Sequence, residues 1–464
     1  MRSIIFYDLT FLVIFTIAIA IFLIIRRKKL EREGILYLYR TKVGIRFINY
    51  IGTKYPKVIS KLRYFVIFFG YIMMIVMIIL LFQILYIYIK LPLFVKEVKI
   101  PPIAPLIPYL PSIFKVDFLP MFYFTYWIIS IAIIAAVHEF SHGIFAKFSK
   151  LKIKSTGFGF LGPLLAAFVE PDEKKMQKIS IKNQLAILGA GSFANLITGF
   201  VFFILLWLFF ASTVISSGVI INSYSADLIN TADITSIIGE TDFIVDGNIS
   251  LTEIEISGKK YFVDENEYNL SSKQIIAYED TPALRNNLRG VIVEIDGKKI
   301  SNTDDLSSQI SKYQPNDKIT IKTLINDSLS IHEFNITLEE HPNNSSMPYI
   351  GIALIKINSG GIFGKLREKL SFFKNPNINY TPKFNPDLVT FIYNLIWWIV
   401  LINISVALVN MLPVGIFDGG RVFYLTVLFL TKSDDKAKKA FAAATYLILF
   451  LILVLMFIWA INFF

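Results

Sequence analysis

Long apolar runs separated by shorter polar stretches dominate this chain of 464 residues. An apolar run of about 20 residues is long enough to cross a bilayer as a helix. A shorter apolar piece, residues 422–430, is interpreted as the continuation of the fifth of the long runs given below, which is interrupted around Pro413 and Gly415. The pattern is typical of a polytopic α-helical membrane protein. Six long runs predict six transmembrane helices, at residues 4–25, 64–89, 122–148, 184–214, 388–412 and 442–463.

Residues 215–387, between the fourth and fifth runs, form a long polar stretch. Within it, apolar and polar residues alternate over 291–300, and Asp296-Gly297 in the middle predicts two strands joined by a turn. Residues 302–310 begin with a capping Asn and continue with the spacing of an amphipathic helix. We therefore expect an inserted α/β domain.

Basic residues gather in the links between particular spans. Residues 26–63 carry twelve Lys and Arg, and residues 147–182 carry eight. Because cytoplasmic loops are enriched in Lys and Arg, these links are predicted to be cytoplasmic, with both termini and the 215–387 domain extracytoplasmic. Topology and contacts with anionic membrane lipids account for the formal net charge of +11, so no nucleic-acid partner is expected.

Four regions follow from this pattern. Residues 1–63 form a membrane anchor and a basic cytoplasmic loop, and residues 64–214 form a first membrane region. Residues 215–387 form the extracytoplasmic domain, and residues 388–464 form the last membrane helices. The first apolar run precedes its basic residues, which is opposite to a cleavable signal peptide. We expect it to be retained in a multi-pass protein of the cell membrane.

Composition restricts the candidate chemistry to a few side chains. The chain has no cysteine, which excludes disulfides, thiolate metal sites and cysteine nucleophiles. Of its four histidines, His138 and His142 lie inside the third apolar run, in the sequence His-Glu-Phe-Ser-His. Residues four apart on a helix share nearly the same face, so both imidazoles can bind one ion, and Glu139 can take a proton from water.

A chance occurrence of this short pattern in a helix is the alternative. An ionisable residue inside a membrane costs roughly 2.5–3.5 kcal/mol, which favours a bound metal over an unpaired cluster. Asp418, another carboxylate in apolar sequence, is the candidate third ligand, since His332 and His341 belong to the polar domain. The alternative role of Asp418 is a helix cap at a turn rich in Gly and Pro.

The helix-borne HExxH, a later Asn-x-x-Pro followed by Asp-Gly, and an intervening polar domain resemble the site-2 protease family of intramembrane zinc metalloproteases. The resemblance implies one catalytic zinc on His138, His142 and Asp418, with Glu139 as the catalytic acid and base. It also implies that Asn195, in Gly191-Ser-Phe-Ala-Asn195, and Asn410 bind substrate backbone or stabilise the oxyanion. An interhelical hydrogen bond is the alternative for each Asn.

Two further segments resemble parts of that family. The Gly-rich apolar stretch 157–170 is similar to its re-entrant β-hairpin, whose edge pairs with an extended substrate, and a simple membrane-dipping loop is the alternative. Residues 276–358 resemble a PDZ module, which binds a peptide or a C-terminus as an added strand. Residues 215–275 receive no assignment.

The predicted function is hydrolysis of peptide bonds within or near the transmembrane segments of membrane-protein substrates. The active site is expected towards the cytoplasmic side. One alternative is a non-catalytic membrane scaffold, or a cation or proton transporter that uses the buried His and carboxylate cluster. Another is a membrane-anchored protease that acts on soluble chains.

Overall fold

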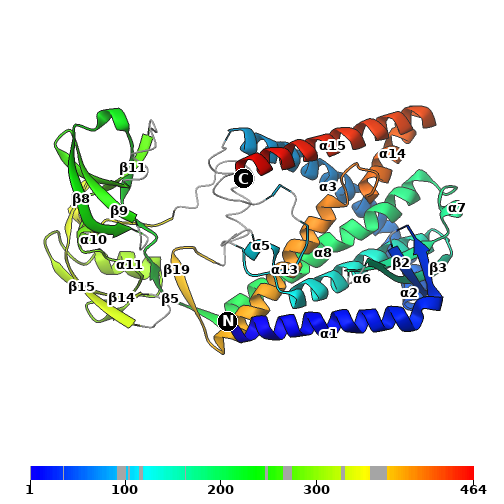
Figure 1. Ribbon diagram of the computed structural model, residues 1–464, viewed down its shortest axis with the longest axis horizontal. Helices are drawn as coiled ribbons and strands as arrows, with labels where there is room; N and C mark the ends of the chain where they lie inside the picture. Colours follow the sequence, from blue (N-terminus) through cyan, green and yellow to red (C-terminus); the bar gives the residue numbers. More distant parts are fainter. Residues whose placement is uncertain are drawn as a thin grey trace. The chain divides into compact units, whose positions relative to one another are not determined.

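The computed structural model describes residues 2–34, 36–90, 101–102, 105–113, 119–161, 164–245, 249–264, 274–325, 330–355 and 374–463. The chain forms two compact units. The first comprises residues 1–208 and 390–464, and the second comprises residues 209–389. The labels of Figure 1 identify the helices and strands of both.

Six long apolar helices, counted over the described residues, confirm the predicted spans. The shortest has 24 residues, about 36 Å at helical rise, which exceeds the roughly 30 Å of a bilayer core. The last helix begins at Asp434, before the predicted position 442, because its first two turns are polar and lie outside the apolar run; Asp434–Lys438 and Asp435–Lys439 pair on their exposed surface. The helices are α1 (Arg2–Arg26), α3 (Pro56–Lys90), α6 (Phe124–Phe148), α8 (Ile181–Thr213), α13 (Pro386–Val409) and α15 (Asp434–Phe463).

The predicted break in the fifth span is confirmed. Helix α13 ends at Val409, and a separate helix, α14 (Asp418–Thr431), begins after an irregular segment. Asp418 is therefore the first residue of a helix inside the membrane unit. Figure 1 shows α13 and α14 as distinct helices.

A four-stranded antiparallel sheet lies at the end of α6 that carries the histidines. Its order is β1 (Leu30–Glu33), β2 (Leu36–Thr41), β3 (Ile153–Leu161) and β4 (Leu164–Pro171). Strands β3 and β4 confirm the hairpin expected at 157–170, and residues 162–163 at its turn lie outside the described part. Strands β1 and β2 replace the basic loop that the sequence predicted after the first span. Arg40 of β2 connects the sheet through ion pairs with Glu31 and Glu170 and a hydrogen bond to Ser155.

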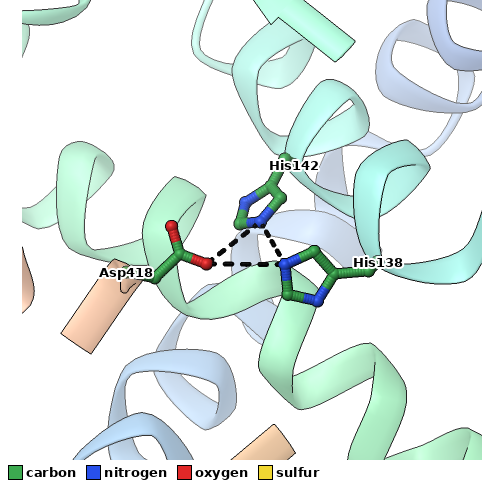
Figure 2. A group of neighbouring side chains, drawn as sticks. All are labelled: His138, His142 and Asp418. Carbon is green, nitrogen blue, oxygen red and sulfur yellow. Dashed lines mark hydrogen bonds and ion pairs between the residues drawn. The ribbon is translucent and has the colours of Figure 1, made fainter. Parts of the chain in front are cut away.

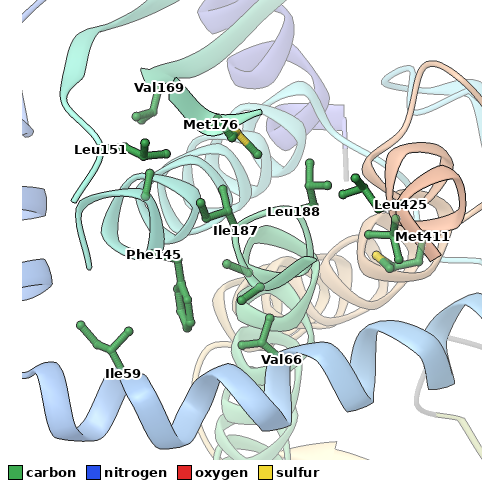
Figure 3. Packing of buried hydrophobic residues seen from close by; sticks show 14 of the residues in the cluster. Ile59, Val66, Phe145, Leu151, Val169, Met176, Ile187, Leu188, Met411 and Leu425 are labelled. Carbon is green, nitrogen blue, oxygen red and sulfur yellow. The ribbon is translucent and has the colours of Figure 1, made fainter. Parts of the chain in front are cut away.

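The core of the membrane unit lies where α3, α6 and α8 meet the segment around α14. Figure 3 shows Val66 of α3, Phe145 of α6 and Ile187 of α8 in one apolar cluster with Met411 and Leu425. All five side chains are less than a tenth exposed. This packing fixes the helices that carry the candidate site relative to one another.

Short helices complete the first unit. Helix α2 packs on α6, where Ile48 is fully buried, and a Cβ on Gly143 would lie 2.9 Å from its side chain. The sequence analysis did not identify α2, which has only ten residues and lies within the basic link after the first span. The short elements are η1 (Arg27–Lys29), α2 (Ile45–Lys54), α5 (Leu110–Ile113) and α7 (Glu173–Met176).

The second unit is built mainly of strands. A six-stranded sheet has the order β15-β14-β12-β5-β19, with β13 paired to β12, and a five-stranded sheet has the order β7-β11-β10-β9-β8. The first sheet comprises β5 (Val214–Ile220), β12 (Val291–Ile295), β13 (Lys298–Lys299), β14 (Lys318–Ile325), β15 (Ser330–Thr337) and β19 (Ile378–Pro382). The second comprises β7 (Ala226–Asn230), β8 (Ser236–Val245), β9 (Ile249–Ile256), β10 (Lys259–Asp264) and β11 (Gln274–Glu279). The remaining elements are β6 (Ser223–Tyr224), η2 (Thr231–Asp233), α10 (Pro282–Arg285), α11 (Thr303–Ile310), β16 (Glu339–His341), β17 (Asn344–Tyr349) and β18 (Ile352–Ala353).

The local predictions in this unit are confirmed. Strands β12 and β13 are joined by Asp296 and Gly297, both with positive φ, as a tight hairpin turn requires. The Asn302 side chain accepts a hydrogen bond of 2.8 Å from the Asp305 backbone N–H and caps α11. The unassigned stretch 215–275 supplies β5 and most of the five-stranded sheet, and residues 326–329 and 356–358 of the predicted PDZ-like module lie outside the described residues.

Asp8 of α1 caps the N-terminus of α6 across the helix interface. Its carboxylate accepts hydrogen bonds from the backbone N–H groups of Phe124 and Thr125, at 2.8 and 2.9 Å. Tyr109 and the Thr125 hydroxyl also donate to it, and Asp8 is only 4% exposed. The residue that precedes α6, Tyr123, offers no side-chain cap of its own.

We expect Asp8→Ala to lower the free energy of unfolding by about 1–2 kcal/mol, because it removes a helix cap and leaves buried N–H groups unpaired. Asp8→Asn keeps one acceptor oxygen and should cost less. Thermal unfolding of the full chain in detergent, followed by tryptophan fluorescence, measures both. Asp435→Ala, at a side chain that is 73% exposed, is the matched control and should change the midpoint little. Equal shifts for Asp8→Ala and Asp435→Ala would contradict the capping role.

Candidate functional site

His138 and His142 face the same point from consecutive turns of α6. Their Nε2 atoms lie 3.0 Å apart, and Figure 2 shows both rings turned towards Asp418. The helix is continuous through this segment, so the four-residue spacing places the rings one above the other, as the sequence predicted.

Asp418 reaches the histidines because the chain turns sharply just before α14. Its Oδ2 atom lies 3.5 Å from His138 Nε2 and 3.3 Å from His142 Nε2. The Gly419 N–H donates to the Asn410 carbonyl at 2.8 Å, which closes the turn. A Cβ on Gly419 would lie 2.6 Å from the Leu412 carbonyl oxygen, and one on Gly420 would lie 2.7 Å from the Val414 carbonyl carbon. The two glycines therefore allow the turn that delivers the carboxylate.

The three ligand atoms have the spacing of a zinc site. Zinc bonds of about 2.0–2.1 Å in a tetrahedron place neighbouring ligand atoms roughly 3.3–3.4 Å apart. The separations here are 3.0, 3.3 and 3.5 Å, and all three ligand atoms lie within 4.8 Å of one another. Two imidazoles with one carboxylate are also a donor set that catalytic zinc uses. The residues fit one ion with an open fourth position.

Gly191 of α8 borders the same point. A Cβ at this position would lie 2.6 Å from His138 Nε2 and would also collide with His142 Nε2. The space in front of both ring nitrogens thus exists because residue 191 has no side chain. The sequence placed Gly191 in a motif but gave it no role.

Hydrogen bonds from α8 orient both imidazoles. His142 Nδ1 lies 2.6 Å from the Ile187 carbonyl oxygen, to which it donates, so Nε2 is free to bind a metal. His138 Nδ1 lies 3.1 Å from the amide nitrogen of Asn195, whose Oδ1 is buried with no partner among the described residues. A half-turn of the amide places Oδ1 as the acceptor that His138 Nδ1–H requires when its Nε2 binds a metal.

The two predicted asparagines lie in different places. Asn195 is fully buried behind His138. Asn410 lines a cleft of about 320 Å³ together with His138, Glu139, His142 and Asp418. Arg421 also lines this cleft, although the sequence analysis gave it no role. The geometry thus makes Asn410 accessible to a ligand in the cleft and makes Asn195 a partner of the His138 ring.

Glu139 stands between the ligand histidines and the sheet. Its Oε2 atom accepts a hydrogen bond of 2.9 Å from the Val169 N–H of β4. Strand β4 is an edge strand of the sheet, and the bond to Glu139 shows that this N–H points away from β3. The carboxylate lines the cleft beside the histidines, where it can accept a proton from water.

We expect Gly191→Ala to weaken zinc binding by roughly tenfold or more, because the added methyl group occupies the space in front of both Nε2 atoms. Zinc content of the purified full chain, measured by mass spectrometry after dialysis against a weak chelator, tests this. Gly70→Ala is the control, since its Cβ would meet only the flexible end of Met411 at 3.3 Å. Full zinc retention in Gly191→Ala would place the metal elsewhere.

We expect Asn195→Ala to lower zinc affinity by about 10–100-fold, as loss of a hydrogen bond behind a ligand histidine does. Asn403→Ala removes another fully buried Asn, on α13, whose amide nitrogen donates to the Ile399 carbonyl of the same helix, and should retain zinc. An oxyanion role predicts a different result, a fall in kcat with unchanged zinc affinity. Competition with a fluorescent chelator distinguishes the two.

Comparison with known proteins agrees with this site. Residues 126–455, which include every candidate site residue, match the family described as Peptidase family M50. An uncharacterized protein of Methanocaldococcus jannaschii is 49% identical over 72 residues, which cover 15% of this chain and 19% of that protein. The match spans about a fifth of that relative, so it carries no functional argument. The family match covers most of the chain: this chain belongs to peptidase family M50, the site-2 protease family of membrane metalloproteases.

Proposed function

We propose that the protein is an intramembrane zinc metalloprotease that hydrolyses peptide bonds within or near transmembrane segments of other membrane proteins. The convergence of His138, His142 and Asp418 beside Glu139, on helices of the membrane unit, carries this proposal. Buried ionisable groups in such surroundings are costly unless a partner compensates them, and a metal provides that compensation.

The chain supplies distinct groups for hydrolysis. When bound, a zinc ion would act as a Lewis acid and lower the pKa of water towards ~7. Glu139 takes the proton of the attacking water and returns it to the leaving amide nitrogen. The Asn410 amide, which lines the cleft, is placed to donate a hydrogen bond to the substrate backbone or to the developing oxyanion. Asn195 acts indirectly, because its hydrogen bond to Nδ1 orients the His138 ring.

Strand β4 is the proposed docking edge for the substrate. Because the Val169 N–H faces away from β3, strand alternation directs the N–H and C=O groups of Ala167 and Leu165 to the same free edge. A transmembrane helix hides its peptide bonds in its own hydrogen bonds, so the substrate must unwind before it is cut. An added strand at this edge would hold it extended next to Glu139.

We also propose the topology that the basic residues predict. The sheet β1–β4 and the links that carry most Lys and Arg are placed on the cytoplasmic side of the cell membrane, with the cleft near that side. The unit 209–389 would then be extracytoplasmic. Its residues 276–358 are proposed to act as a PDZ-like module that binds a peptide or a C-terminus of the substrate.

Replacement of Glu139 by Gln tests the proposed function. The amide keeps the size of the side chain but has no basic oxygen, so we expect zinc to stay bound and cleavage of a single-span peptide in nanodiscs to fall by at least about 100-fold. The parent protein should lose activity with a chelator and regain it with zinc.

Three outcomes would contradict the proposal. Cleavage at the parent rate by Glu139→Gln would exclude Glu139 as the proton acceptor. Zinc binding without any cleavage by the parent would favour the scaffold or transporter alternative. Faster cleavage of soluble casein than of the single-span peptide would favour a protease that acts on soluble chains.

A further inference from the structure

An apolar cavity of about 180 Å³ lies between α6 and the sheet, next to Glu139. Three alanines of α6, Ala132, Ala135 and Ala136, form one wall, and Leu165 and Phe168 of β4 contribute to the opposite wall. Glu139 is the one ionisable side chain among its lining residues. The small alanine side chains leave space that larger residues would fill.

The cavity and the candidate active site share Glu139 in their walls. That residue lines both the cavity and the cleft that holds His138 and His142. Strand β4 also borders both spaces, with Phe168 at the cavity and Val169 at the cleft. A strand added along the edge of β4 would therefore pass both the cleft and the cavity.

The distance along α6 from Glu139 to the alanines of the cavity wall limits which substrate residue can place its side chain in the cavity. Ala136 and Ala132 precede Glu139 by three and seven residues, about 4.5 and 10 Å at helical rise. An extended chain advances about 3.3 Å per residue, so these distances correspond to roughly one to three substrate residues.

The size and lining of the cavity define the chemistry of its occupant. An apolar protein cavity of about 150 Å³ binds benzene and excludes water. A cavity of about 180 Å³ therefore has room for a branched aliphatic or an aromatic side chain. Such side chains are abundant in transmembrane segments.

We propose that this cavity is a specificity pocket that receives a large apolar side chain of the substrate, within about three residues of the cleaved bond. The inference rests on the proposed protease function and adds a sequence preference to it. A lipid acyl chain is the competing occupant, and it would impose no preference on the cleaved sequence.

The test uses the full chain in nanodiscs and a set of single-span peptides. Each peptide carries Ala, Leu, Phe or Trp at one of the three positions on either side of the scissile bond, and mass spectrometry gives the cut site and rate. We expect the parent to prefer Leu or Phe over Ala at one of these positions by about tenfold or more.

Two variants change the pocket in opposite directions. Ala132→Leu, about two turns from Glu139, fills it and should lower the Leu-to-Ala ratio of kcat/KM at that position by about tenfold. Leu165→Ala enlarges the pocket and should raise the Trp-to-Leu ratio of kcat/KM at the same position. Misfolding cannot produce such a gain. Ala443→Leu, at an exposed alanine of α15, is the control and should leave both ratios unchanged.

Each result decides the inference. A lower Leu-to-Ala ratio in Ala132→Leu together with a higher Trp-to-Leu ratio in Leu165→Ala supports it. Parent-like ratios in both variants would overturn it while leaving the protease function intact, and would favour a lipid acyl chain. Absence of chelator-sensitive cleavage of every peptide by the parent would overturn the protease function, and this inference with it.

Discussion

The meeting of two imidazoles and a carboxylate among apolar helices constrains the whole membrane unit. Polar groups buried in such surroundings are costly unless they are paired, so the elements that carry them must be held close together. Helix α6 supplies two groups with fixed spacing, but Asp418 comes from 276 residues further along the chain than His142. Gly419 and Gly420 permit the turn that brings it back, and Gly191 leaves room between the partners.

The ligand residues were predictable because each is an ionisable residue in an apolar run and two share a helix face. The spans were predictable for the same reason, since apolar length alone determines them. The environment of the ligands was not predictable. The Ile187 carbonyl and the Val169 N–H are backbone groups, and a side-chain pattern does not reveal where they point. The position of Asn195 depends on how α8 packs against α6, which the sequence alone does not determine.

Elements with weak or interrupted patterns were the ones missed. Strands β1 and β2 are short and lie among basic residues, so their alternation was hidden by charge. In the second unit, the β8–β9 pairing shifts register twice, and Gly239 has a φ of +151°. Such irregular strands break the period of two that identifies a strand in sequence. The hairpin within 291–300 keeps its alternation although β12 has a register shift between Ile292 and Glu294, and its two strands and turn were predicted.

The contribution of β1 and β2 to the sheet links the N-terminal segment to the catalytic region. These strands cover one side of β3, and Arg40 ties them to Glu170, next to the residue that touches Glu139. A homologue or engineered form without the first 41 residues would keep His138, His142 and Asp418 but would move the second edge of the sheet from β1 to β3. Both edges of the sheet would then belong to the hairpin itself, whereas the second edge of the full sheet lies on β1. The N-terminal strands therefore move the edge opposite β4 two strands further from the His138, His142 and Asp418 cluster.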